Sequence, residues 1–146
     1  MSHPFSFFPA VLFALATLLP LAATRADDEA EKKAAVEAMT PWLTLTDKGE
    51  YGESYDEASA AFKEAVTRAD WIKALEDVRK PLGSLESRDL LSSVLLTTLP
   101  DGTQGTYVLA QFESAFTDLA NANETVTFEK EDDGTWRAAG YFIRPN

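Results

Sequence analysis

The sequence predicts an α+β domain in which three N-terminal helices pack on a four-stranded antiparallel meander sheet. Apolar residues recur at helical spacing up to about residue 80, whereas apolar and polar residues alternate from Ser84 onward. Turn sequences separate the alternating segments, which favours consecutive antiparallel strands. Because every helix precedes every strand, the helices most simply cover one face of the sheet and make a two-layer domain.

The first predicted helix spans residues 28–45, where Ala, Glu and Lys are abundant. Ala38, Trp42 and Leu45 lie on one face of such a helix and form an apolar stripe. Pro41 falls inside this segment and lacks a backbone N–H, so we expect the helix to kink or restart there.

Two capping patterns predict where the next helices begin. Ser54 is followed three residues later by Glu57, which is a capping box for a second helix. Thr67 with Asp70 is a weaker version of the same pattern and starts a third helix, which ends at the Pro-Leu-Gly sequence of residues 81–83. The apolar face of the third helix consists of Trp71, Leu75 and Val78.

Four alternating segments follow, and turn residues separate them. Pro-Asp-Gly at residues 100–102 and Asp-Asp-Gly at residues 132–134 are the clearest turn signals. The predicted strands span residues 88–99, 106–116, 124–131 and 136–144. Three successive turns between them make the meander.

The N-terminal segment has the features of a secretion signal. Residues 5–23 are apolar and uncharged, and small residues at Thr24 and Ala26 suit cleavage after Ala26. We therefore expect a signal peptide at residues 1–26 and one domain at residues 27–146, which is periplasmic or secreted and has no transmembrane segment. An alternative stays open, because the apolar run is nearly long enough to span a bilayer. An uncleaved segment would tether the domain to the inner membrane.

Cleavage would change the chemistry available to the chain. The sequence has no cysteine, and its single histidine, His3, leaves with the signal. The mature chain then lacks the side chains most often used for nucleophilic, acid–base and transition-metal chemistry near neutral pH. It keeps 12 basic and 24 acidic residues, a formal net charge of −12. We expect no nucleic-acid partner, because phosphate backbones are repelled by such a surface.

Known catalytic and cofactor motifs are incomplete in this sequence. The string Gly-Glu-Ser-Tyr-Asp at residues 52–56 lacks the final glycine of a nucleophile elbow. A calcium loop starting at Asp47 would place Gly49 and Tyr51 where oxygen ligands are needed. Neither a Walker loop nor a dinucleotide fingerprint is present. We therefore expect no catalytic triad, no metal site and no cofactor.

A series of landmarks runs along nearly all of the chain after Ala26. It includes Trp42-Leu43-x-Leu45-x-Asp47-x-Gly49-x-Tyr51, Val78-Arg79-x-Pro81-Leu82-Gly83, Gly105-x-Tyr107-Val108 and Asp133-Gly134-x-Trp136-Arg137. In this order the landmarks resemble the uncharacterised bacterial family catalogued as domain of unknown function 4019. The resemblance implies a small exported or envelope-associated domain and brings no activity, substrate or catalytic residue with it. Helices on a bent antiparallel sheet are also similar to the cone-shaped NTF2-like and cystatin-like folds.

Charged and polar residues of the predicted sheet are the remaining candidates for a site. Arg79 and Arg88 flank the turn at residues 81–83, and Glu124 begins the third strand, so folding could bring a guanidinium against this carboxylate. One interpretation is a structural ion pair. The other is a cavity at the open end of the sheet that holds a small polar ligand. The residues proposed for ligand binding are Arg79, Arg88, Tyr107, Gln111 and Glu124.

Two functions from different classes remain open. The first is a non-catalytic binding or interaction module of the cell envelope, with a protein or small ligand as its unknown partner. Export, acidic charge and the missing catalytic side chains favour it. The second is a small-molecule pocket or a carboxylate-dependent enzyme on a cone-shaped fold. We interpret Trp42, Trp71 and Trp136 as core residues, and a concave face filled by large aromatic side chains would rule out the pocket.

Overall fold

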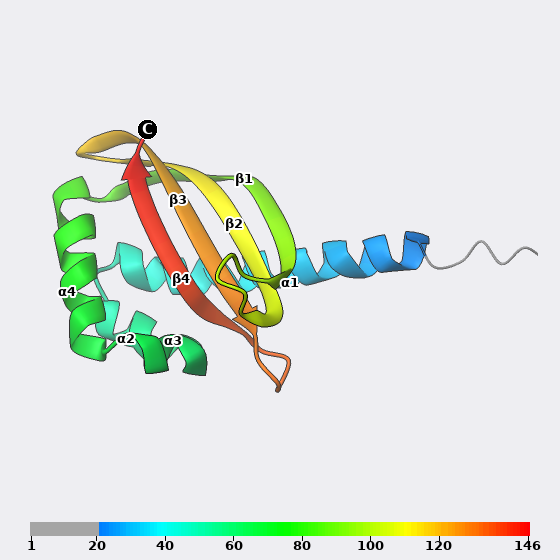
Figure 1. Ribbon diagram of the computed structural model, residues 1–146. Coiled ribbons are helices and arrows are strands. Elements are labelled where there is room, and N and C mark those ends of the chain that lie inside the picture. Colours follow the sequence, from blue (N-terminus) through cyan, green and yellow to red (C-terminus); the bar gives the residue numbers. More distant parts are fainter. Residues whose placement is uncertain (1–20) are drawn as a thin grey trace, which may run out of the picture.

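A four-stranded antiparallel sheet in the order β1-β2-β3-β4 forms one layer of the domain, and helices form the other (Figure 1). The structure is a computed structural model that describes residues 21–146. The strands are β1 (Leu85–Thr98), β2 (Gln104–Phe116), β3 (Leu119–Lys130) and β4 (Trp136–Pro145). The predicted α+β meander is confirmed.

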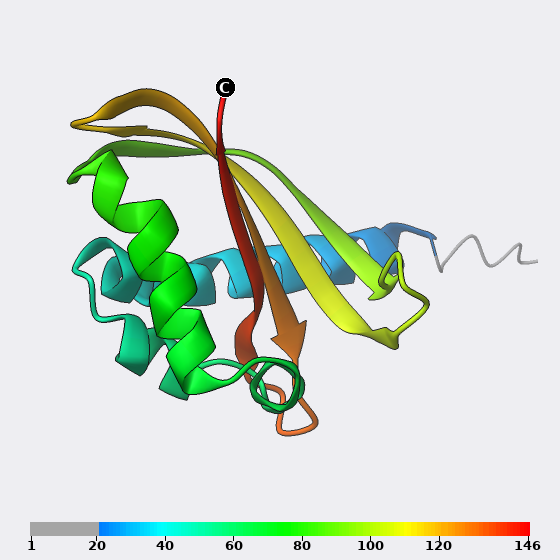
Figure 2. The same ribbon diagram turned by 60° about the vertical axis from the view of Figure 1, so that its left-hand side comes forward.

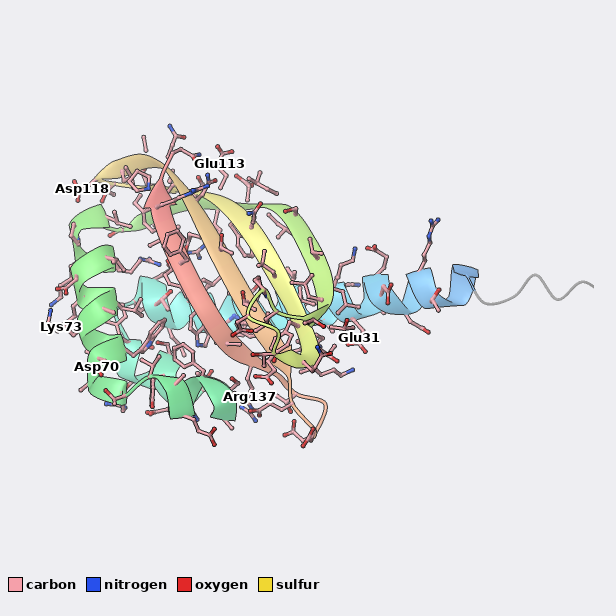
Figure 3. The ribbon with its side chains drawn as sticks, viewed as in Figure 1. Glu31, Asp70, Lys73, Glu113, Asp118 and Arg137 are labelled. Carbon is pink, nitrogen blue, oxygen red and sulfur yellow. The ribbon has the colours of Figure 1, made fainter. Side chains whose placement is uncertain are left out.

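Four helices precede the sheet. They are α1 (Leu21–Asp47), α2 (Tyr51–Asp56), α3 (Ala60–Ala65) and α4 (Arg68–Arg79), followed by a 3₁₀ turn at Lys80–Leu82. Helix α1 contacts all four strands on the concave face of the sheet, and α4 stands on the β4 side (Figure 2). Asp70 and Lys73 of α4 point away from the sheet (Figure 3).

Residues 1–20 lie outside the described part of the chain, and they include most of the apolar run expected to be an export signal. Among the described residues, no helix combines the length and the apolar character needed to cross a membrane.

Helix α1 runs without interruption through Pro41, so the expected restart is wrong. Pro41 is exposed, whereas Met39, Trp42 and Leu43 are buried against the sheet. Packing of these side chains offsets the one backbone hydrogen bond that proline cannot make. Nearer the N-terminus, Glu31 accepts a 2.5 Å hydrogen bond from Lys130 of β3, which holds α1 under the sheet (Figure 3).

Ser54 is not the helix cap that its sequence pattern predicts. Helix α2 begins at Tyr51, and Ser54 lies inside it, fully buried. Its hydroxyl donates to the carbonyl of Tyr51 (2.7 Å) and accepts from the indole N–H of Trp71 (3.0 Å). Its carbonyl accepts from the indole N–H of Trp42 (2.8 Å). Ser54 therefore joins α2 to the tryptophans of both α1 and α4.

Other residues cap the helices that follow. Ser59 caps α3 and Thr67 caps α4, and each accepts a 3.2 Å hydrogen bond from the backbone N–H three residues later. The cap predicted at Thr67 is confirmed. Val78 was expected on the buried face of α4 but is 43% exposed, and Arg79 occupies the buried position after Leu75 instead.

The strands occur in the predicted order, and glycines with positive φ close two of the turns, Gly102 at 89° and Gly134 at 80°. Strand β1 bulges at Glu86 and at Leu91, which have no partner in the register, and a third irregularity lies between Leu96 and Thr98. Such bulges bend a strand, and the bent sheet curves around α1.

Large aromatic side chains fill the concave face. The Trp42 ring lies 6.2 Å from Trp71, 5.8 Å from Phe128 and 5.9 Å from Tyr141, measured between ring centroids. Trp42 and Trp71 are buried, as the core interpretation predicts, while Trp136 is partly buried at the edge of the core. Helix α1 and these rings fill the concave face of the sheet.

We expect Ser54→Ala to lower the free energy of unfolding by about 2 kcal/mol, because it leaves the buried indole N–H of Trp71 without an acceptor. Urea denaturation followed by tryptophan fluorescence measures the change. Ser87→Ala, at an exposed position of β1, is the matched control and should be nearly neutral. Equal effects of the two substitutions would contradict the linking role of Ser54.

Candidate functional site

Charged side chains from four different elements meet on the concave face of the sheet. We call this group, with the two hydroxyl residues that donate to Glu124, the ionic cluster. It consists of Asp47, Arg79, Arg88, Ser114, Glu124 and Tyr141. Three of the five residues proposed for ligand binding therefore come together.

The sheet register places the β-strand members of the ionic cluster on the concave side. Arg88 is directly opposite Ser114, which is buried. Glu124 belongs to the series of alternate β3 residues that includes Val126 and Phe128, and all three are buried. Two-residue periodicity thus aims the guanidinium and the carboxylate at the same space.

The Arg88 guanidinium makes two bidentate ion pairs at once. Its Nη1 and Nη2 donate to the two carboxylate oxygens of Asp47, both at 2.8 Å. Its Nε and Nη2 donate to the two oxygens of Glu124, at 2.8 and 3.1 Å. The planar fork of arginine suits this arrangement, which lysine could not reproduce. Arg88 thereby connects the end of α1 to the middle of the sheet.

Arg79 is almost completely buried and approaches the same carboxylates from α4. Its Nη2 donates to Asp47 at 2.7 Å, and its Nη1 donates to the Tyr141 hydroxyl at 2.9 Å and lies 3.6 Å from Glu124. The guanidinium stacks over the Phe116 ring at 4.7 Å. Its Nε has no hydrogen-bond partner.

Glu124 is fully buried and has no unused lone pair. Besides its two bonds from Arg88, one oxygen accepts from the Ser114 hydroxyl at 2.5 Å and the other from the Tyr141 hydroxyl at 2.6 Å. Burial and the nearby Glu124 charge raise the pKa of Tyr141, so its phenol stays protonated and keeps donating.

The charges of the ionic cluster balance, with two guanidinium groups against two carboxylates. Burial raises the pKa of Asp47, but hydrogen bonds and charges from Arg88 and Arg79 outweigh burial and leave its pKa below the usual value. Burial lowers the pKa of Arg88, but its hydrogen bonds to Asp47 and Glu124 outweigh burial and leave the pKa above its usual value. Each carboxylate of the cluster is therefore paired with both guanidinium groups, which fits the structural ion-pair interpretation.

Tyr107 and Gln111 lie away from the ionic cluster, on the opposite face of the sheet. Gln111 is exposed, and it alternates along β2 with the buried residues of the concave face. Tyr107 is buried because its ring folds over Gly105, where a Cβ atom would come within 2.7 Å of the ring. The predicted site combined residues from opposite faces of the sheet, because strand alternation places Tyr107 and Gln111 on one face and Arg88 and Glu124 on the other.

Sequence reasoning missed Asp47, Ser114 and Tyr141. Asp47 did carry a usable signal, because a carboxylate at the last residue of a helix faces the negative end of the helix dipole and calls for a cation nearby. For Ser114 and Tyr141 the sequence gives no such signal, apart from the face of the sheet that strand alternation assigns to each.

A furrow runs along the seam between α1 and β1, where three hollows adjoin. The hollow beside the ionic cluster has a volume of about 420 Å³, and both Asp47 and Arg88 line it. The next, of about 260 Å³, shares Val36 and Leu90 with the first. The third, of about 250 Å³, shares Ser93 with the second. The furrow therefore follows the edge of the sheet.

A separate hollow of about 520 Å³ lies between α3 and the β3–β4 turn, and carboxylates dominate its lining. Two of them already have partners: Glu131 accepts from the backbone N–H of Ala60, and Asp133 from that of Thr135. Over residues 21–146, no group of three or more His, Cys, Asp or Glu side chains is arranged to hold a metal ion.

We expect Arg88→Met to lower the free energy of unfolding by about 3 kcal/mol, because it leaves two carboxylates in the ionic cluster without their main partner. Arg88→Lys should fall between this variant and the wild type, since it keeps the charge and loses the bidentate geometry. Arg144→Met, on the exposed end of β4, is the control. Urea denaturation measures all three, and equal losses for Arg88→Met and Arg144→Met would contradict this account.

The lowered pKa of Asp47 predicts a pH dependence with a definite sign. The pKa of Asp47 is lower in the folded chain than in the unfolded chain, where it is about 3.8, so the unfolded chain binds the proton more readily. The stability that Asp47 contributes is therefore present above that pH and is lost as the pH falls through the folded pKa. Wild type should exceed Asp47→Asn in unfolding free energy at pH 6, and the difference should shrink below pH 4. Urea denaturation across this range measures it, and a constant difference would refute the prediction.

A comparison with protein families agrees with the sequence landmarks that run from Trp42 to Arg137. The family described as "Protein of unknown function (DUF4019)" has a model that matches residues 38–141, which is most of the chain. The matched segment includes the whole ionic cluster and excludes the N-terminal part of α1. No curated protein matches the chain. With its match running from α1 to β4, the chain belongs to the DUF4019 family.

Proposed function

We propose that this chain is an exported, non-catalytic interaction domain of the bacterial cell envelope. The observation that carries the proposal is the furrow, which lies beside β1, an edge strand that pairs with β2 on one side and with no described strand on the other. A binding surface at the edge of a sheet needs no catalytic side chain. It also suits a domain whose interior is filled.

The closed interior supports binding over catalysis. Glu124 has no access to solvent, and every lone pair of its carboxylate is engaged, so it is not placed to move a proton to or from a substrate. Trp42, Trp71 and Phe112 fill the concave face where a cone-shaped pocket would lie. The alternative of a small-ligand pocket retains one supporting observation, which is that the furrow ends on Asp47 and Arg88.

The burial of α1 is compatible with export and cleavage. Side chains of residues 24–30 are exposed, and from residue 24 onward the first fully buried one on the helix is Ala35. Cleavage after Ala26 would therefore leave the packed part of α1 intact. It would also start the helix with Asp27, Asp28 and Glu29, and carboxylates in the first turn interact favourably with the helix dipole.

Site-specific photocrosslinking in cells tests location and binding together. The full chain is expressed in a bacterial host with a photoreactive residue in place of Leu90, which lies in the furrow. A matched variant carries it in place of Phe142, which is 61% exposed on β4 at the other edge. We expect the chain in the periplasmic fraction to begin at Asp27 and to form a discrete crosslinked species from position 90 only.

Two outcomes would contradict the proposal. A chain that keeps Met1 and stays in the cytoplasm would refute export. A chain that keeps Met1 and is found in the membrane fraction would establish the tethered alternative. Equal crosslinking from positions 90 and 142 would refute binding at the furrow.

A further inference from the structure

We propose that β1 accepts an extended segment of a partner protein as a fifth strand, whose inward side chains enter the furrow, and that this segment alternates apolar with basic residues. The inference rests on the proposed function and names the partner's chemistry and its mode of binding.

The backbone of β1 is available for pairing. β1 is 14 residues long and lies at the end of the sheet, where within residues 21–146 only β2 pairs with it. The opposite edge is partly covered, because the N–H of Ser59 donates to the carbonyl of Ala138 on β4 at 2.8 Å and Ala58 bridges the same residue. The two edges therefore differ within residues 21–146, because β4 is paired at Ala138 on its outer side and β1 has no pairing on its outer side.

The side chains of β1 leave this edge unprotected. Exposed edge strands usually carry lysine, proline or inward-pointing charges that prevent pairing with another chain. From residue 90 to residue 98 the sequence Leu-Leu-Ser-Ser-Val-Leu-Leu-Thr-Thr has no charge and no proline. Leu90, Leu91 and Val94 are 46%, 57% and 48% exposed. An edge of this kind is expected to be covered in the working state of the protein.

The occupant of this edge must pair with the β1 backbone and also place side chains in the furrow, and an extended peptide does both. Leu90, Ser93 and Leu95 of β1 line its hollows, and α1 forms the other wall. A strand added beside β1 would continue the sheet over α1 and place every second side chain in the furrow. A helix has no free backbone groups for β1, and a small ligand would leave most of the edge unpaired.

The charge around the furrow favours a basic partner. Asp28 lines the furrow and Glu86 and Asp89 lie on β1, and none of the three makes an ion pair with another described residue. Arg25 lines the same hollow as Asp28, and cleavage after Ala26 would remove this cation. Lys32 and Lys33 on the α1 wall are already paired with Glu29 and Glu37. Lysine or arginine in the added strand would complement the unpaired carboxylates.

A second copy of this chain fits the edge less well. Self-pairing through β1 would bring Glu86 and Asp89 of both copies to one interface, between molecules that each carry a large negative charge.

Peptide binding to the chain that begins at Asp27 tests the inference. The probe is a fluorescein-labelled ten-residue peptide in which valine and lysine alternate. A valine–glutamate peptide is the charge control, and a version with two central prolines is the pairing control. We expect saturable binding of the valine–lysine peptide by fluorescence anisotropy, and weaker or absent binding of both controls.

Matched variants locate the site. Leu90→Lys in the furrow should weaken binding of the valine–lysine peptide at least about tenfold, because it adds a charge that repels lysine and guards the edge. Phe142→Lys, the same change on β4, should leave the affinity unchanged. Because a variant can lose stability, amide hydrogen exchange of the wild-type protein is measured as well, and β1 amides should gain protection when the peptide binds.

Several results would overturn the inference. They are absence of saturable binding, equal affinity for the proline peptide, equal weakening by Phe142→Lys, or no added protection in β1. Protection of β1 amides without peptide in a dimeric protein would assign the edge to a second copy. If crosslinks form in cells from position 90 while the peptide fails to bind, strand addition falls and the proposed interaction function stands. If the peptide binds but the chain is not exported, strand addition is supported and the proposed envelope location is refuted.

Discussion

The Arg88 guanidinium makes the contact on which the rest of this structure depends. It binds Asp47 at the end of α1 and Glu124 in the middle of the sheet, so it holds the long helix against the concave face. Arg79 brings the end of α4 to the same carboxylates. Buried charges are tolerated only when all their partners are in place, because an unpaired one loses its hydration without compensation. The ionic cluster therefore couples the positions of two helices and all four strands of the sheet.

This constraint moves the candidate binding surface from the inside of the fold to its edge. With α1 held by the ionic cluster and its tryptophan packed under the sheet, the space inside the curved sheet is occupied. The bulges that curve β1 around α1 leave a furrow along the seam and an unprotected strand beside it. Recognition by strand addition uses both features, and it needs neither a cavity nor a reactive side chain.

Sequence reasoning succeeded where local chemistry decides the outcome. Interactions between residues a few positions apart account for the cap at Thr67, for the turns at Gly102 and Gly134 and for the alternation along β2 and β3. It failed at Ser54, because a serine before a glutamate has the same local signature whether it caps a helix or accepts a bond from a distant tryptophan. It failed at Val78 for a related reason, since helical spacing allows either Val78 or Arg79 to face the core.

Local sequence patterns predict the fold class and the order of the strands, and they allow an arginine to meet the Glu124 carboxylate. Periodicity and turn residues are sufficient for these features, because each depends on short-range geometry. Only the tertiary structure decided that Asp47 and Tyr141 complete the cluster, that Tyr107 and Gln111 lie on the other face, and that β1 is left as an open edge beside α1. These features depend on how the helices dock on the sheet, and docking is set by long-range packing that no local pattern encodes.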